Sequence, residues 1–253
     1  GSGNGGDGIY SKTMKILGGI IQKAIGGNAN GNTCTGGSGI HSDGTLTISG
    51  GEIQEATGGD STGNSGKGGT GIRGDQVVNI SGGIIESATG GSGDSGGGAG
   101  IGTGAKPAFA TEINISDGTI TEAIGGNGGA GIGSGANSSK ATTINISGAA
   151  FIQKATGGTG GAGIGGGKNS SGETKVNITG GKVNASTGYG NGGAGIGSGR
   201  YAKGKTYVTI SNASVSTLET PAASTNTSGA GIGTGYGSQS NADITITEST
   251  VKA

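Results

Sequence analysis

Apolar and polar positions along the chain follow a unit that recurs at nearly constant spacing. Each unit opens with a glycine-rich phrase that holds one isoleucine, as in GAGIGSG at residues 129–135 and 193–199. The phrase isoleucines are Ile9, Ile40, Ile72, Ile101, Ile132, Ile164, Ile196 and Ile232. The intervals between them are 31, 32, 29, 31, 32, 32 and 36 residues. A fixed period of this length is the sequence signature of a repeat architecture in which successive units stack.

A second phrase in each unit alternates apolar and polar residues, as in LTIS, VNIS and INIS. Its first apolar positions are Met14, Leu46, Val78, Ile113, Ile144, Val176, Val208 and Ile244. Its second apolar positions are Ile16, Ile48, Ile80, Ile115, Ile146, Ile178, Ile210 and Ile246. Alternation with a period of two predicts a strand with one buried face, and β-branched residues suit that pleated surface.

A third apolar position follows five residues later, at Ile21, Ile53, Ile85, Ile120, Phe151, Val183, Val215 and Val251. No segment shows the period of an amphipathic helix, so each unit predicts three short strands separated by glycine-rich bends. We expect residues 1–253 to form one all-β domain, a single-stranded parallel β-helix (solenoid) of about eight coils, each of roughly 31–32 residues. The phrase isoleucines and the second-phrase isoleucines are then two ladders of stacked side chains.

The composition also favours a thin, extended core. Of the 253 residues, 68 are glycine, and only 28% are hydrophobic, which is too little apolar surface for one compact core. The phrase GAGIGSG is then a sharp corner, where glycine permits positive φ and close approach of backbones. A phosphate-binding loop is excluded because neither Lys-Ser/Thr nor a helix follows the phrase. A polyglycine-II bundle is disfavoured because its three-residue rhythm does not continue through INIS or VNIT.

Charge and rare residues exclude several classes of function. The balance of 15 basic and 15 acidic residues argues against a nucleic-acid partner. No apolar run approaches the roughly 20 residues of a membrane span. Cys34 is the only cysteine, so no internal disulfide forms. His41 is the only histidine and no carboxylate pair recurs between coils, so we expect neither an enzyme nor a cofactor.

Two stretches carry a resemblance to a known family: GGDGIYSKTMKILGGII (residues 5–21) and GGSGIHSDGTLTISGGEI (residues 36–53). They resemble repeats of bacterial surface β-helix proteins of the carbohydrate-binding-domain family, and the similarity extends over essentially every coil. The resemblance implies a right-handed β-helix, secretion, and in some members calcium-assisted binding of acidic polysaccharide. The acid of the family's Gly-Asp-Gly-Ile is present only as Asp7, however; the equivalent residues are Ser38, Thr70, Ala99, Ala130, Ala162, Ala194 and Ala230. Calcium therefore has no support in the sequence.

A first set of candidate ligand-binding residues comes from the position after the phrase isoleucine. This residue is glycine in the last five units, whereas the first three units have Tyr10, His41 and Arg73. Stacked coils would place these side chains in a short outward column, close to Asp43 and Asp75. Two interpretations stay open: a polar or sugar-binding patch, and a solvated corner without a ligand. The RGD tripeptide at residues 73–75 matches the integrin-recognition sequence, but it adjoins an anchored corner instead of a flexible tip.

A second set lies in the C-terminal half. Lys168, Arg200, Tyr201 and Tyr236 each follow a phrase isoleucine by four or five residues, and Tyr189 lies in a preceding loop. A basic and aromatic strip of this kind suits stacking on sugars or binding of an acidic glycan. Ordinary surface placement is the alternative.

The polar position inside the second phrase forms another column: Lys15, Thr47, Asn79, Asn114, Asn145, Asn177, Thr209 and Thr245. Stacked asparagines predict a ladder of amide hydrogen bonds, while regular Thr and Asn on a flat face are also typical of ice binding. The four asparagines lie in Asn-x-Ser/Thr sequons. Glycans on strands about 4.8 Å apart would collide, so we expect unmodified asparagines and a bacterial source.

These observations together predict a non-catalytic, extracellular segment of a longer cell-surface protein, acting as an adhesin or binding a glycan. The alternative is a structural stalk or fibre subunit that assembles end to end, because no capping element is visible at either rim of the β-helix. Ice binding is a third possibility. The expected partners are an extracellular glycan or further copies of the chain, with no nucleic acid and no membrane span.

Overall fold

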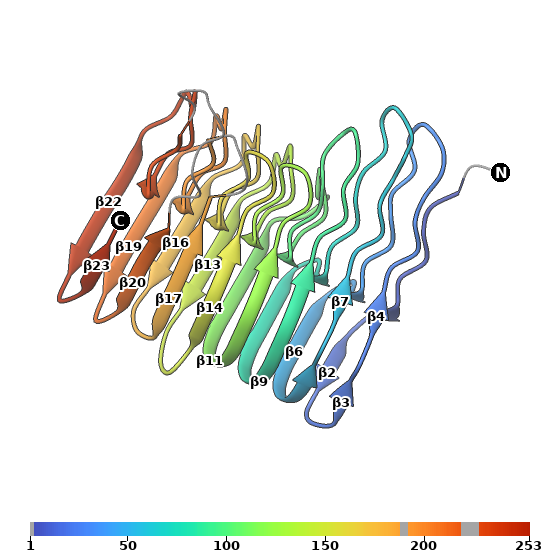
Figure 1. Cartoon of the computed structure of the whole chain (residues 1–253), viewed down its shortest axis with the longest axis horizontal. Coiled ribbons are helices and arrows are strands. Elements are labelled where there is room, and N and C mark those ends of the chain that lie inside the picture. The colour runs from blue at the N-terminus through green and yellow to red at the C-terminus, as the bar shows by residue number, and fades with distance from the viewer. Residues whose placement is uncertain (1–2, 188–191, 219–227) are drawn as a thin grey trace.

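The computed structural model of the chain describes residues 3–187, 192–218 and 228–253. Its strands lie in stacked rungs, and the chain winds from rung to rung in sequence order along the length of the molecule (Figure 1). The named strands pair in parallel, and no helix occurs among the described residues. This confirms the predicted parallel β-helix. The described part of the chain accordingly has no helix long and apolar enough to cross a membrane.

One column of short strands is formed by the glycine-rich phrases, which we call the corner strands. They form an 8-stranded sheet of β1 (Ile9–Ser11), β5 (Ile40–Ser42), β8 (Ile72–Gly74), β10 (Ile101–Gly102), β12 (Ile132–Gly133), β15 (Ile164–Gly165), β18 (Ile196–Gly197) and β21 (Ile232–Gly233). The seven intervals between these strands correspond to about seven complete turns, slightly fewer than the eight coils predicted. The two numbers differ because eight successive corner strands enclose only seven complete turns.

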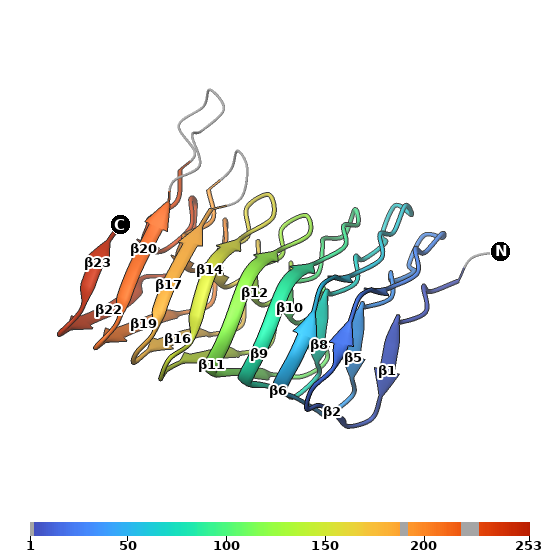
Figure 2. The same cartoon turned by 60° about the horizontal axis from the view of Figure 1, so that its bottom comes forward.

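The second and third predicted strands of each unit belong to one 15-stranded sheet. Its first strands are β2 (Met14–Ile16), β3 (Ile20–Ile21), β4 (Ala24–Ile25), β6 (Thr45–Ile53), β7 (Ala56–Thr57), β9 (Val77–Thr89) and β11 (Thr111–Ile124). It continues with β13 (Thr142–Ile146), β14 (Phe151–Thr156), β16 (Thr174–Ile178), β17 (Lys182–Ser186), β19 (Thr206–Ser211), β20 (Ser214–Leu218), β22 (Ala242–Thr247) and β23 (Thr250–Lys252). Figure 2 shows the corner strands following one another on a different side of the rod from β6, β9 and β11.

The core is a thin line of stacked aliphatic side chains between these two sheets. Corner isoleucines pair directly with one another, as Ile101 does with Ile132 and Ile132 with Ile164. These three side chains are 0% exposed, because each has a like neighbour above and below it. The ladder is less complete at its ends, where Ile9 and Ile232 are only partly buried against the core.

One unit departs from the predicted third apolar position. Ile120 pairs with Ile152, whereas Phe151 pairs with the outward Thr119. Ile152 is fully buried and Phe151 is only partly buried, with the Lys182 ammonium 5.3 Å from its ring centroid. The prediction of Phe151 as the inward residue was therefore wrong. The bend before β14 has one residue more than the bend inside β11, which moves the inward position by one.

The glycines of the last five corners have a backbone conformation that other residues rarely adopt. Their φ values lie between +134° and +140° at Gly102, Gly133, Gly165, Gly197 and Gly233. A Cβ atom on Gly165 would lie 1.9 Å from the carbonyl oxygen of Gly197 in the next rung. Glycine is therefore required both by the backbone angle and by the approach of the next rung.

Asparagine side chains form a continuous ladder along the outer face of the 15-stranded sheet. The Asn114 amide nitrogen donates to Asn79 Oδ1 at 3.0 Å. Asn145 donates to Asn114 Oδ1 at 2.8 Å, and Asn177 donates to Asn145 Oδ1 at 2.8 Å. Each amide thus links its own rung to the preceding one.

Candidate functional site

The first three corner strands bring one set of predicted site residues into a column. Tyr10 pairs with His41, and His41 pairs with Arg73. Strands β1, β5 and β8 have three residues, whereas the later corner strands have two. The longer strands keep the residue after the isoleucine in the pleat, so its side chain points away from the isoleucine ladder.

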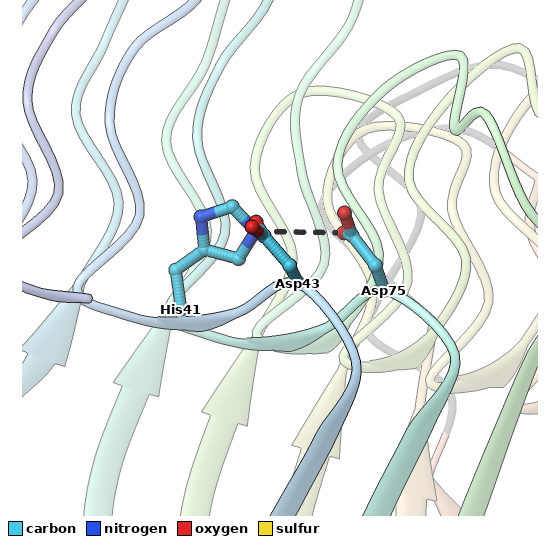
Figure 3. Close-up of side chains that lie close together, drawn as sticks. All are labelled: His41, Asp43 and Asp75. Carbon is cyan, nitrogen blue, oxygen red and sulfur yellow. Dashed lines mark ion pairs between the residues drawn. The ribbon is translucent and has the colours of Figure 1, made fainter. Parts of the chain in front are cut away.

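His41 lies at the centre of this column and contacts carboxylates on both sides of its ring. Its Nδ1 lies 2.7 Å from Asp7 Oδ2, and Asp7 Oδ1 accepts a hydrogen bond from the Ser38 backbone N–H at 2.6 Å. Its Nε2 lies 3.5 Å from Asp75 Oδ1 and 3.7 Å from Asp43 Oδ1. Figure 3 shows the His41 ring extending toward the side on which the carboxylates of Asp43 and Asp75 lie. Nε2 is buried and has no hydrogen-bond partner among the described residues, because both of these distances are too long.

Two further residues hold the outer carboxylates. The Tyr10 hydroxyl donates to Asp43 Oδ2 at 2.5 Å, and the centroids of the Tyr10 and His41 rings are 5.4 Å apart. The Arg73 Nε donates to Asp75 Oδ1 at 2.5 Å. Since Arg73 and Asp75 bind each other, the RGD tripeptide is not presented as a free tip. We call Asp7, Tyr10, His41, Asp43, Arg73 and Asp75 the corner cluster.

The charges of the corner cluster stabilise one another. Burial disfavours a charged His41, but its hydrogen bond with Asp7 and the nearby carboxylate of Asp75 outweigh burial and raise its pKa to about 9. Burial also disfavours ionised Asp7 and Asp75. Their contacts with His41, supplemented by Ser38 N–H and by Arg73 respectively, nevertheless lower both pKa values below 3.8. At neutral pH His41 is therefore an imidazolium between the ionised carboxylates of Asp7 and Asp75.

The corner cluster lies deeper than the short outward column that the sequence predicted. His41 is only 9% exposed, while Tyr10 is 54% exposed. The Asp43 side chain is 45% exposed and forms the outer wall of the cluster. The sequence analysis did not include Asp7 among the site residues. The sequence contained one signal for this residue: Asp7 is the only acidic residue at the Gly-x-Gly-Ile position, and it lies one rung from His41.

The second predicted set also comes together, at the other end of the rod. The Asn169 N–H donates to Arg200 O, and the Tyr201 N–H donates to Tyr236 O, so Lys168, Arg200 and Tyr236 follow one another on successive rungs. The Arg200 guanidinium carbon lies 4.4 Å from the Tyr201 ring centroid and 5.5 Å from that of Tyr236. The Arg200 Nη2 donates to the Tyr201 hydroxyl at 2.6 Å.

We call Arg200, Tyr201 and Tyr236 the aromatic strip. Tyr201 and Tyr236 are 39% and 41% exposed, and their ring centroids are 6.2 Å apart. Arg200 Nε is buried and has no hydrogen-bond partner in the described part of the chain. Tyr189, the remaining predicted aromatic residue, lies outside the described residues.

A polar groove of about 420 Å³ lies close to the aromatic strip, lined by Lys203, Lys205, Gln239, Ser240, Asn241 and Asp243. The Gln239 N–H donates to Ala202 O, which brings the segment after Tyr236 alongside the segment after Tyr201. The sequence analysis missed this groove, because its two walls come from segments more than 30 residues apart in the chain.

No family model, no curated protein and no solved structure matches this chain.

Proposed function

We propose that this β-helix is a non-catalytic, extracellular adhesin segment that binds an acidic glycan through the aromatic strip and the adjoining groove. The observation that supports this most directly is the placement of Arg200 over two half-exposed tyrosine rings. The resemblance to bacterial carbohydrate-binding surface proteins supports the same ligand class.

The chemistry of the strip suits a sugar that has a carboxylate or sulfate group. Aromatic rings present an apolar face to the C–H groups of a pyranose ring, and a tyrosine adds a polar edge. The Arg200 guanidinium is held by its hydrogen bond to Tyr201, so its geometry is fixed before a ligand arrives. Lys203 and Lys205 line the adjoining groove and add positive charge to it. A chain of several sugars would contact the strip and the groove together.

Binding to an array of neutral, sialylated, sulfated and uronic-acid glycans tests this proposal. We expect acidic glycans to bind, and Tyr236→Ala and Arg200→Ala each to weaken binding about tenfold or more, equivalent to ~1.4 kcal/mol. Phe109→Ala is the matched control, because Phe109 is 53% exposed and lies outside the strip. Absence of binding by the intact chain would contradict the proposal, as would full binding by both strip variants. Release of shortened glycan during incubation would contradict the non-catalytic part.

A second candidate function, end-to-end assembly, is supported by the exposed last rung. Ile244 and Ile246 are 45% and 46% exposed. Their partners in the preceding rung, Val208 and Ile210, are 1% and 0% exposed because another rung covers them. Strand β22 also has one unpaired edge, which is suited to parallel pairing with a further rung. A second copy of the chain that presents β1 and β2 to this edge would continue both ladders.

Sedimentation velocity and negative-stain electron microscopy over a range of concentrations test this second function. We expect filaments that are lost in an Ile244→Lys, Ile246→Lys variant, since charge would be buried between rungs. Ile84→Lys is the matched control, because Ile84 is 41% exposed on the side of the rod. A chain that stays monomeric at every concentration would rule this function out.

A further inference from the structure

The corner cluster contains an arrangement that the proposed glycan site does not use. The single side chain of His41 extends toward the carboxylates of Asp43 and Asp75, which come from two adjacent rungs (Figure 3). One ligand atom from each of the three residues lies within 4.8 Å of the others. His41 Nε2 is 3.5 Å from Asp75 Oδ1 and 3.7 Å from Asp43 Oδ1.

The two distances from His41 Nε2, 3.5 Å and 3.7 Å, are close to those between atoms that share a metal ion. Zinc binds nitrogen and oxygen at roughly 2.0–2.2 Å with tetrahedral geometry, which places neighbouring ligand atoms about 3.3–3.6 Å apart. Direct hydrogen bonds would be shorter, at about 2.7–3.2 Å. The Asp43 side chain is 45% exposed and therefore has room to complete the geometry by a small rotation.

The free nitrogen of His41 is an independent sign of a ligand. Nε2 is buried and makes no hydrogen bond among the described residues, and the His41 side chain is only 11% exposed. A buried polar atom that makes no hydrogen bond is costly, so this nitrogen is suited to bind a further ligand. Nε2 faces both carboxylates, at 3.7 Å from Asp43 Oδ1 and 3.5 Å from Asp75 Oδ1.

The other side of the ring is prepared in the manner of metal-binding histidines. Asp7 Oδ2 lies 2.7 Å from Nδ1. An ionised carboxylate only accepts hydrogen bonds, so the Nδ1 proton points to Asp7 and the lone pair of a neutral imidazole is on Nε2. Carboxylate partners of this kind orient metal-ligating histidines and raise their basicity. Tyr10 and Arg73 in turn hydrogen-bond to Asp43 and Asp75 and hold them beside the ring.

We propose that His41 Nε2, Asp43 and Asp75 bind one divalent transition-metal ion of the zinc class, with Asp7 as a positioning residue. Three protein ligands leave a fourth position for water or an external oxygen ligand. A nitrogen ligand and two carboxylates fit zinc better than calcium, which takes six to eight oxygen ligands. Metal binding displaces the proton from Nε2 into solvent. The charge of the metal ion then replaces the charge of the imidazolium, and the two do not compete in the bound state.

Calorimetric titration of the chelator-treated chain with Zn²⁺ alone is the first test. We expect one saturable site, with affinity lowered at least about tenfold in His41→Gln and Asp75→Asn and roughly 10- to 100-fold in Asp7→Asn. Asp94→Asn is the matched control, since Asp94 is an exposed carboxylate outside the cluster. Circular dichroism of each variant separates loss of ligands from loss of fold. No saturable site in the wild-type chain, or equal affinity in a folded His41→Gln, would overturn the proposal.

A second measurement needs no variant, because His41 is the only histidine. In a ¹⁵N-histidine-labelled chain, Zn²⁺ should shift the Nε2 resonance and leave Nδ1 protonated toward Asp7. Unchanged imidazole resonances at saturating Zn²⁺ would overturn the assignment of His41 as ligand. Tighter binding of Ca²⁺ than of Zn²⁺ would overturn the choice of metal class. Neither result depends on glycan binding, so this proposal and the proposed function fail or succeed separately.

Discussion

The first three and the last five corners of this β-helix begin with the same inward isoleucine and then differ in one residue. In the last five, glycine follows with φ near +135° and brings the backbone against the next rung. In the first three, Tyr10, His41 and Arg73 follow, φ is not positive, and the strand continues for one more residue. The last five corners thus have close backbone packing and no side chain at the position after the isoleucine. We call the first three the side-chain corners, because the side chains at this position belong to a charged cluster.

This comparison indicates where a repeat protein of this kind has room for chemistry. The isoleucine ladder runs through both regions, so the fold does not depend on which type of corner is present. The aromatic strip is a second departure of the same kind. Ala136, Lys168, Arg200 and Tyr236 occupy the same position on four successive rungs. The backbone N–H of each donates a hydrogen bond to a glycine-rich loop. Both candidate sites therefore lie where large polar or aromatic side chains replace the small residues of the repeat.

The largest expected effect is a loss of stability when a corner glycine is replaced. Gly165→Ala should destabilise the chain by about 3 kcal/mol or more, because φ is +134° and the new Cβ would lie 1.9 Å from Gly197 O. Gly104→Ala is the control, since its Cβ would make only ordinary contacts at 3.6 Å with Thr70 and 3.7 Å with Arg73. Denaturant unfolding followed by circular dichroism measures both. Equal stabilities would show that the corner glycines are not required.

The next effect concerns the side-chain corners and their pH dependence in the metal-free chain. The His41 pKa is raised from 6.5 to about 9, so its stabilising contribution is complete below pH 6.5 and is lost as pH rises through 9. The loss amounts to up to about 3 kcal/mol, at 1.36 kcal/mol per pKa unit. It arises from the contacts of His41 with Asp7 and Asp75, while burial and the charge of Arg73 oppose it.

Denaturant unfolding at a series of pH values checks this prediction, with His41→Gln as the comparison variant. The wild-type chain should lose stability between pH 6.5 and about 9, and the variant should not. At the acid end, Asp7 and Asp75 have lowered pKa values, so their contribution is lost as pH falls below about 3.8. A parallel high-pH decline in both proteins would contradict the assignment to His41.

A smaller effect tests the asparagine ladder, which continues across the boundary between the two regions. Asn145→Ala removes hydrogen bonds to Asn114 and Glu112 and leaves Asn177 without its acceptor. We expect a loss of about 1–2 kcal/mol. Thr209→Ala, two rungs further along the column, is the control, because the described structure gives the Thr209 hydroxyl no ladder hydrogen bond. The difference in unfolding midpoint between the two variants is the measurement.

The smallest effect comes from an exposed ion pair, which contrasts with the enclosed charges of the corner cluster. Lys154 Nζ lies 2.7 Å from Glu122 Oε1, with side chains 56% and 33% exposed. Lys154→Ala should change the unfolding free energy by less than about 0.5 kcal/mol, because water and salt screen the pair. A salt-sensitive loss as large as that of Asn145→Ala would show that this face is more shielded than its exposure indicates.

The sequence by itself determined the parallel β-helix, because a period-two alternation repeated at a nearly fixed interval has few other ways to bury its isoleucines. It also placed Tyr10, His41 and Arg73 in one column, since the same register that stacks the isoleucines stacks their neighbours. Register is a property of spacing, and spacing is visible in a sequence. The insertion before Ile152 shows the limit, because a single extra residue in a bend changes which side chain points inward.

Only the tertiary structure decided how deep each side chain lies and what it contacts. The burial of His41, the carboxylate of Asp7 behind its ring and the groove beside Tyr236 all depend on segments from different rungs meeting in space. Burial and hydrogen bonding set the charge state of His41. These quantities depend on distances between side chains of different rungs, which the period of the sequence does not specify.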